Sequence, residues 1–376
     1  MHDDVLGNVN LLTEILLRLP VKDALRCKCV CKKWMSLISN PQFCYWHTLG
    51  LCRKHKHKNN PNPNPYLYPS GMLFQRTVDY LRDKKACVIP FNNCSSRFMQ
   101  LNAHVKFEGT LSYILLRSCN GLTLWDSIPV PWSKKLVKRC SFYINNPSTG
   151  RCVRIDKFGY EYRFSRPYLA FEPWKSPHYK VIFLECTKTT PKMSVYSSHT
   201  GSCSKLDVHL SFPNKNFDPC HDDGGVYCNG AIHWYDHSAY LDIDRLCFKN
   251  LPVLPIPRTG LLQVKHFGES GGNLYLIIEE SRYRGRYDFW ELKEDYSEWI
   301  LKYHVNRTYA DPLCVICQPP NEDEQEESIC ANLLVGYKKL VSYNLKDHSC
   351  KTFYEEEDSS FVDVKVYPYF ETLASI

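Results

Sequence analysis

Hydrophobic residues recur at helical spacing near the start of the chain. Five of them, spaced three or four residues apart or adjacent, predict one face of a helix: Leu11, Leu12, Ile15, Leu16 and Leu19. Asn10 precedes them, and its short side chain can cap the first turn. Pro20 ends the helix because its ring cannot continue the hydrogen-bond ladder. A short second helix is expected over residues 21–25 and a third from Val30, with Trp34, Leu37 and Ile38 on its apolar face.

The pattern changes beyond residue 66. Short aromatic and β-branched runs are interrupted there by Gly, Pro, Asn and Asp, which is typical of an all-β domain. Residues 59–65 read NNPNPNP, and prolines at that density exclude a helix and favour extended backbone. We therefore expect a helical module over residues 5–47, a basic and Asn/Pro-rich linker over residues 48–66, and a β domain over residues 67–370.

The β region contains a repeat. Each copy has an apolar residue, a run of polar or turn-forming residues, and another apolar residue ten places on, as in a hairpin. The copies are residues 143–153, 196–206, 241–251, 290–300 and 343–353, with a fainter sixth at 80–90. Gly-containing turns upstream, at residues 120–121, 229–230 and 271–272, indicate about four strands per repeat. A period near 50 predicts a kelch-like β-propeller of about six blades; a β-sandwich or barrel is the alternative.

A series of short motifs in the helical module resembles the F-box family. RLPVK at residues 18–22, LR at 25–26, VCKKW at 30–34, LIS at 37–39 and NPQF at 40–43 follow in the order of that family. The resemblance implies that the module binds a small adaptor of the Skp family and, through it, a cullin. It implies the contact residues Leu11, Ile15, Leu19, Pro20, Leu25, Val30 and Trp34.

The module departs from the family at its first residues. Family members usually begin with Leu-Pro, whereas this chain has Gly7 and Asn8. The change removes apolar contact worth on the order of 1 to 3 kcal/mol per fully buried side chain. The alternative to adaptor binding is that these helices dock on the rest of the chain as an N-terminal cap.

Motifs in the β region resemble the F-box-associated domain of a large plant family. They lie at residues 118–122, 146–150, 171–181, 195–201, 225–234 and 267–270, and the resemblance covers most of residues 110–355. Uneven loops at residues 129–139, 211–223 and 281–287 are the candidate binding face, since variable connections carry recognition. The candidate substrate-binding residues are Trp132, Arg282, Tyr283, Arg284 and Arg286.

Composition and charge indicate the compartment. The chain has 376 residues, no run of 18 apolar residues and an acidic start, so we expect a soluble protein of the cytoplasm or nucleus, without a membrane partner. Nineteen cysteines, an odd number, are expected to be reduced thiols. Most of the net charge of +7 lies before residue 66, but the basic tract at residues 53–58 lacks the interleaved aromatics of a nucleic-acid site.

Candidate catalytic and metal motifs lack their required context. Residues 268–272 match a G-x-S-x-G nucleophile elbow with His266 nearby, but the strand-like run at residues 274–278 follows where the elbow needs a helix. We therefore predict an inter-strand turn at Ser270, with a serine hydrolase as the rival. Cys314 and Cys317 form a lone C-x-x-C pair without a matching second pair, so no metal is expected. No cofactor motif is present.

These observations predict a non-catalytic, substrate-recognising subunit of a Skp/cullin/F-box ubiquitin ligase, with a protein substrate held by the β domain. The alternative is a stand-alone β-propeller scaffold with a degenerate F-box.

Overall fold

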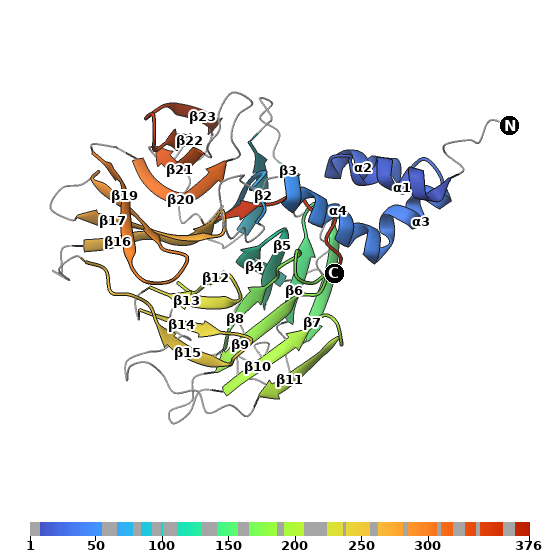
Figure 1. The fold of residues 1–376 in the computed structure, drawn as a ribbon, viewed down its shortest axis with the longest axis horizontal. Helices are drawn as coiled ribbons and strands as arrows, with labels where there is room; N and C mark the ends of the chain where they lie inside the picture. Colours follow the sequence, from blue (N-terminus) through green and yellow to red (C-terminus); the bar gives the residue numbers. More distant parts are fainter. Residues whose placement is uncertain are drawn as a thin grey trace.

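Four helices precede the strands in the part of the chain that the structure describes (Figure 1). The computed structural model describes residues 8–54, 66–77, 84–91, 99–100, 111–129, 141–156, 165–185, 192–206, 224–235, 238–255, 262–280, 285–306, 310–318, 328–335, 339–355 and 365–376. The helices are α1 (Val9–Leu17), α2 (Val21–Cys27), α3 (Lys32–Ser39) and α4 (Pro41–Lys54). Three of them are expected from the sequence. The fourth, α4, extends into the first residues of the segment expected to be a linker.

The ends of the first helices follow local rules. Pro20 lies between α1 and α2, as predicted. The predicted cap was wrong, because Asn8 and not Asn10 is the N-cap of α1. The Asn8 side chain accepts hydrogen bonds from the backbone amides of Asn10 (3.0 Å) and Leu11 (3.3 Å). Val30 lies in the turn before α3, which begins only after the extended residue Cys31.

The four helices bury a small core of their own. Leu12 and Leu16 of α1 face Val21 and Ala24 of α2, Ile38 of α3 and Phe43 of α4. Leu373, from the end of the chain, is part of the same cluster and only 1% exposed. A module this small rarely sustains a core alone, and here the C-terminal segment completes it.

The described strands form six four-stranded antiparallel sheets, the blades of a β-propeller. From the inner strand outwards, the first three blades are β24 (Lys365–Tyr369), β1 (Gly71–Thr77), β2 (Lys84–Pro90) and β3 (Met99–Gln100); β4 (Leu111–Cys119), β5 (Leu122–Pro129), β6 (Ser141–Asn146) and β7 (Arg151–Asp156); and β8 (Ser165–Ala170), β9 (Lys180–Glu185), β10 (Lys192–Ser197) and β11 (Ser202–Leu206).

The other three blades have the same order. They are β12 (Val226–Cys228), β13 (Ala231–Trp234), β14 (Ala239–Asp242) and β15 (Cys247–Asn250); β16 (Leu262–Ser270), β17 (Asn273–Glu280), β18 (Tyr287–Leu292) and β19 (Trp299–Val305); and β20 (Ala310–Gln318), β21 (Ser328–Val335), β22 (Lys339–Asn344) and β23 (Cys350–Glu355). The inner strands of neighbouring blades contact one another all around the ring. The six-bladed propeller is confirmed, and the sandwich or barrel is excluded.

The repeat was identified correctly in five of its six copies. Each of the five clear segments is the hairpin between the third and fourth strands of a blade: β6–β7, β10–β11, β14–β15, β18–β19 and β22–β23. The faint sixth copy was wrong, since residues 84–90 form the single strand β2, whose hairpin partner is β3. This blade takes its inner strand from the C-terminus, so its position in the sequence is displaced relative to the others.

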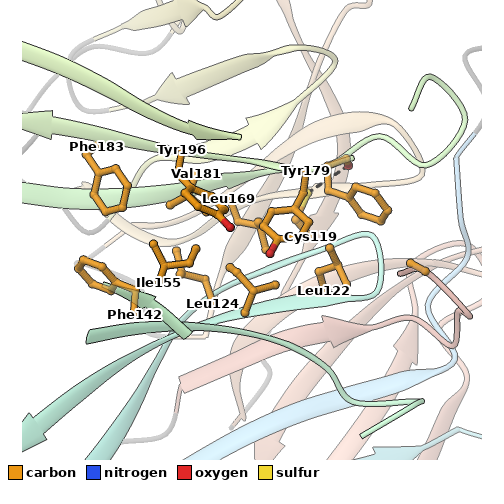
Figure 2. Packing of buried hydrophobic residues seen from close by; sticks show 13 residues of the cluster. Cys119, Leu122, Leu124, Phe142, Ile155, Leu169, Tyr179, Val181, Phe183 and Tyr196 are labelled. Atoms are coloured by element: carbon orange, nitrogen blue, oxygen red, sulfur yellow. Dashed lines mark hydrogen bonds between the residues drawn. The ribbon is translucent and has the colours of Figure 1, made fainter. Parts of the chain in front are cut away.

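Two kinds of contact close and fill the ring. β24 pairs with β1, with Gly71 opposite Tyr369, so the two ends of the β domain share one blade. The predicted Gly turns connect inner strands to second strands, and Asn120 and Gly121 have φ of 46° and 95°, as a tight hairpin turn requires. Between blades, Leu124 and Phe142 face Val181 and Phe183 across the interface (Figure 2).

Candidate interaction face and central channel

The helical module has a second apolar surface, which faces solvent. On α1, Leu11 and Ile15 are each 44% exposed, four residues apart, on the face next to the one that carries the buried Leu12 and Leu16. In the same module, other large apolar side chains on α1, the α2–α3 turn and α3 are also exposed: Val9, Val30 and Met35. Exposed apolar side chains gathered in one small module are typical of an interaction site. We call Val9, Leu11, Ile15, Val30 and Met35 the apolar face.

The residues predicted to contact an adaptor divide into two groups. Leu11, Ile15, Pro20 and Val30 are exposed. The others are half-buried and pack against the helical core: Leu19, Leu25 and Trp34. Sequence reasoning missed Val9 and Met35, which are 47% and 49% exposed.

The opposite side of the module is fixed to the propeller. Lys22 Nζ lies 3.0 Å from Glu371 Oε1, and Leu373 is inserted among the helices. Cys52 of α4 packs against Leu67 and Phe370. Figure 1 accordingly shows α4 and the C-terminus beside the ring, with α1, α2 and α3 further out. These attachments leave the apolar face uncovered.

The family comparison identifies this module. Residues 8–46 match the model of the F-box domain. The N-terminal module is an F-box. The match includes α1, α2, α3 and the first part of α4, and the propeller follows the F-box along the chain.

Two proteins named as F-box proteins are similar to this chain at low identity. The chain is 26% identical over 321 residues to the F-box protein At5g07610 of Arabidopsis thaliana, covering 79% of this chain and 70% of that protein. It is 27% identical over 260 residues to the F-box/kelch-repeat protein At3g23880 of the same plant, covering 65% and 64%. The chain is a distant homologue of Arabidopsis F-box and F-box/kelch proteins. Among solved structures, TolB from Acinetobacter baumannii is similar with a TM-score of 0.46 and 11% identity, over 80% of this chain and 67% of that one.

The propeller has a cavity of about 360 Å³ along its axis. All six inner strands contribute to its wall, together with Glu172 and Trp174 after β8 and Phe370 after β24. Phe370 also packs in one cluster with Cys52 of α4, and Trp174 packs against that cluster. The cavity therefore lies in the half of the ring nearest the F-box, and we call it the channel cavity.

The serine singled out in the sequence has a structural role. Ser270 is the last residue of β16 and is 3% exposed, and the hairpin turn after it leads into β17. Its hydroxyl oxygen accepts a hydrogen bond of 2.7 Å from the backbone amide of Cys317 on β20. The predicted inter-strand turn is confirmed. The strand–turn–helix geometry of a nucleophile elbow is absent at Ser270.

Of the five candidate substrate-binding residues, the structure describes one. Arg286 is exposed just before β18. Trp132, Arg282, Tyr283 and Arg284 lie outside the described residues.

Two further features concern the cysteines of β20 and β21 and the length of the helices. Cys314, Cys317 and Cys330 are buried cysteines on β20 and β21, and within the described residues no cluster of three or more metal-ligating side chains occurs. No helix in the described ranges is long and apolar enough to cross a membrane.

Proposed function

We propose that the chain is a substrate-recognising subunit of a Skp/cullin/F-box ubiquitin ligase. The F-box binds a Skp-family adaptor, which joins it to a cullin, and the propeller holds a protein substrate. The chain itself performs no chemistry in this proposal: it raises the rate of ubiquitin transfer by keeping the substrate near the enzyme that other subunits supply. The cytoplasm or nucleus is the corresponding location.

The apolar face is the observation that carries this proposal. The F-box buries one face of α1 in its own core and exposes Leu11 and Ile15 on the face next to it. Burying a fully exposed aliphatic side chain in a partner stabilises the complex by about 1.5 to 3 kcal/mol. Several such side chains, together with Pro20 and the edges of Leu19, Leu25 and Trp34, would supply the centre of an interface.

The fixed attachment of the F-box supports a positioning role. A ligase adaptor works only if its two binding surfaces keep a defined separation and direction. The Lys22–Glu371 ion pair, Leu373 and the packing of Cys52 on Phe370 provide contacts that hold α4 against the ring. For the substrate we propose the loops of the β domain, including Trp132, Arg282, Tyr283, Arg284 and Arg286.

A capture experiment with a purified Skp-family adaptor tests the proposal. We expect the full chain to bind, and Ile15→Glu to weaken binding at least tenfold, because a carboxylate would have to be desolvated in the interface. Val253→Glu is the matched control, since Val253 is also an exposed aliphatic residue but lies in the propeller. Equal binding by the Ile15→Glu variant and the wild-type chain would contradict the role of the apolar face.

The alternative function is a stand-alone propeller scaffold with a degenerate F-box. The observation in its favour is Asn8, which caps α1 where family members usually have proline. Failure of the full wild-type chain to bind the adaptor, with its melting transition intact, would favour this alternative over the ligase.

A further inference from the structure

The channel cavity contains a carboxylate that has no basic partner. Glu269, near the end of β16, accepts a hydrogen bond of 2.8 Å from the backbone amide of Gly272 through Oε1. In the part of the chain that the structure describes, no Lys, Arg or His side chain forms an ion pair with it. Burial raises the pKa of Glu269 to about 7. A half-buried carboxylate without a countercharge is costly, and a bound cation would relieve that cost.

The pKa values of three side chains near Glu269 and Glu172 are raised: those of Cys119, Cys228 and Tyr227. Burial raises the pKa of the Cys119 and Cys228 thiols, and the carboxylates of Glu269 and Glu172 raise both further. Burial also raises the pKa of Tyr227, and Glu172 raises it further. These side chains of β4 and β12 therefore lie near the two carboxylates. A cation entering this part of the cavity would be attracted by the carboxylate of Glu269.

Of the other charged groups of the cavity, Glu172 and Lys365 have partners of their own, whereas the Nε of Arg117 is buried without a hydrogen-bond partner among the described residues. Glu172 pairs with Lys175 at 2.8 Å. Arg117 of β4 donates a hydrogen bond to the carbonyl of Leu116, and its guanidinium lies 5.0 Å from the centre of the Tyr168 ring. Lys365 of β24 also lines the cavity and has an interaction partner.

The remaining titratable groups of the cavity wall are uncharged at neutral pH. Burial lowers the pKa of His266 to about 4, which leaves its ring neutral. The raised pKa values of Cys119, Cys228 and Tyr227 keep them protonated. Glu269 is therefore the carboxylate of the cavity wall that has no charged partner among the described residues.

Size and lining define the ligand further. A volume of about 360 Å³ is at the lower end of the range for small-molecule sites. Trp174, Tyr227 and Phe267 line the cavity, and aromatic rings attract organic cations as well as apolar groups. We propose that the channel cavity binds a compact organic ammonium compound, whose charged nitrogen donates hydrogen bonds to Glu269 and whose carbon skeleton packs against these aromatic side chains.

Calorimetric titration of the full chain with benzylamine at pH 8 tests this proposal. Benzylamine combines an ammonium group with an aromatic ring, and a ligand of its size should bind with a Kd on the order of 1 mM. We expect Glu269→Gln to weaken binding at least tenfold. Glutamine keeps an oxygen that can accept the Gly272 hydrogen bond, so the turn is retained, and a melting curve checks this. Glu298→Gln is the matched control, because Glu298 is an exposed glutamate in the β18–β19 turn.

Two further measurements make the test independent of the variant. Benzyl alcohol and benzoate should bind at least tenfold more weakly than benzylamine, since neither has a cation. Lowering the pH from 8 to 5.5 should weaken benzylamine binding to the wild-type chain, because Glu269 becomes protonated. Absence of benzylamine binding, equal binding of the three compounds, or unchanged affinity in Glu269→Gln would overturn the proposal. The inference does not rest on the ligase function, and Glu269→Gln should capture the Skp-family adaptor as the wild-type chain does.

Discussion

At the scale of single residues, the role of a side chain depends on what surrounds it. Ser270 and Glu269 are neighbours in β16, and the sequence directed attention to the serine. The Ser270 hydroxyl oxygen accepts a hydrogen bond from the backbone amide of Cys317. Glu269 lines the cavity, and its carboxylate accepts a hydrogen bond from the backbone amide of Gly272. His266, three residues before Glu269 in the same strand, is half-buried, and burial lowers its pKa to about 4, so its ring is neutral.

The raised pKa of Glu269 predicts a pH dependence of stability. Its pKa rises from 4.5 to about 7 on folding, so the native state binds more protons than the unfolded chain between these values. Stability contributed by this group is present below pH 4.5 and falls as the pH rises through 7, by up to about 3 kcal/mol. Glu269→Gln should gain stability relative to the wild-type chain across that range.

Urea unfolding of both proteins from pH 4.5 to 8 measures this difference. His266 acts in the opposite direction, since its lowered pKa makes the folded state gain stability as the pH rises from 4 to 6.5. Because both proteins contain His266, subtracting their unfolding free energies removes its effect. A difference that is constant with pH would contradict the assigned cause.

At the scale of elements, the C-terminal segment after β24 joins the two domains. It crosses from the propeller to the F-box within a few residues, and each side holds part of it. Asn146 Nδ2 donates to the carbonyls of Thr372 and Ala374, and Leu373 between them points into the helical core. Alternation of neighbouring side chains, typical of extended backbone, lets one short segment contact both domains.

Leu373→Ala should therefore destabilise the F-box more than the propeller. Removing a buried leucine side chain costs about 2 to 5 kcal/mol through lost burial and the cavity left behind. We expect faster proteolysis within α1 to α4 and weaker adaptor capture, with the propeller fragment still resistant. Leu301→Ala, at an exposed leucine of β19, is the control that should have little effect. Unchanged cleavage of the helices in Leu373→Ala would contradict the joining role.

At the scale of the whole molecule, closure of the ring depends on one strand from the end of the chain. β24 supplies the inner strand of the first blade, and its last residue, Tyr369, packs with Leu73 of β1 and Trp125 of β5. The Tyr369 hydroxyl lies 3.1 Å from Ser148 Oγ. Without β24, β1 would present an unpaired edge, the usual starting point of aggregation.

Tyr369→Ala should weaken this closure. We expect a loss of about 3 to 5 kcal/mol in unfolding free energy, from the cavity left by a 3% exposed aromatic ring, and a greater tendency to aggregate. Tyr369→Phe keeps the ring and loses only the hydroxyl interaction, so it should cost about 1 kcal/mol. Thermal melting and size-exclusion chromatography of the two variants separate the effects, and equal losses in both would argue against closure by packing.

The sequence alone determined what local patterns can specify. Helical periodicity ended by Pro20 specified α1 and α2, and hairpin turns at regular spacing specified five of the six repeats, because turn and strand preferences act over a few residues. The blade shared by β24 and β1, the insertion of Leu373 into the F-box, and the exposure of Ile15 beside the buried Leu16 were decided only by the tertiary structure. Each depends on which distant segments meet, and the position of Glu269 in the wall of a cavity became visible only when six inner strands enclosed it.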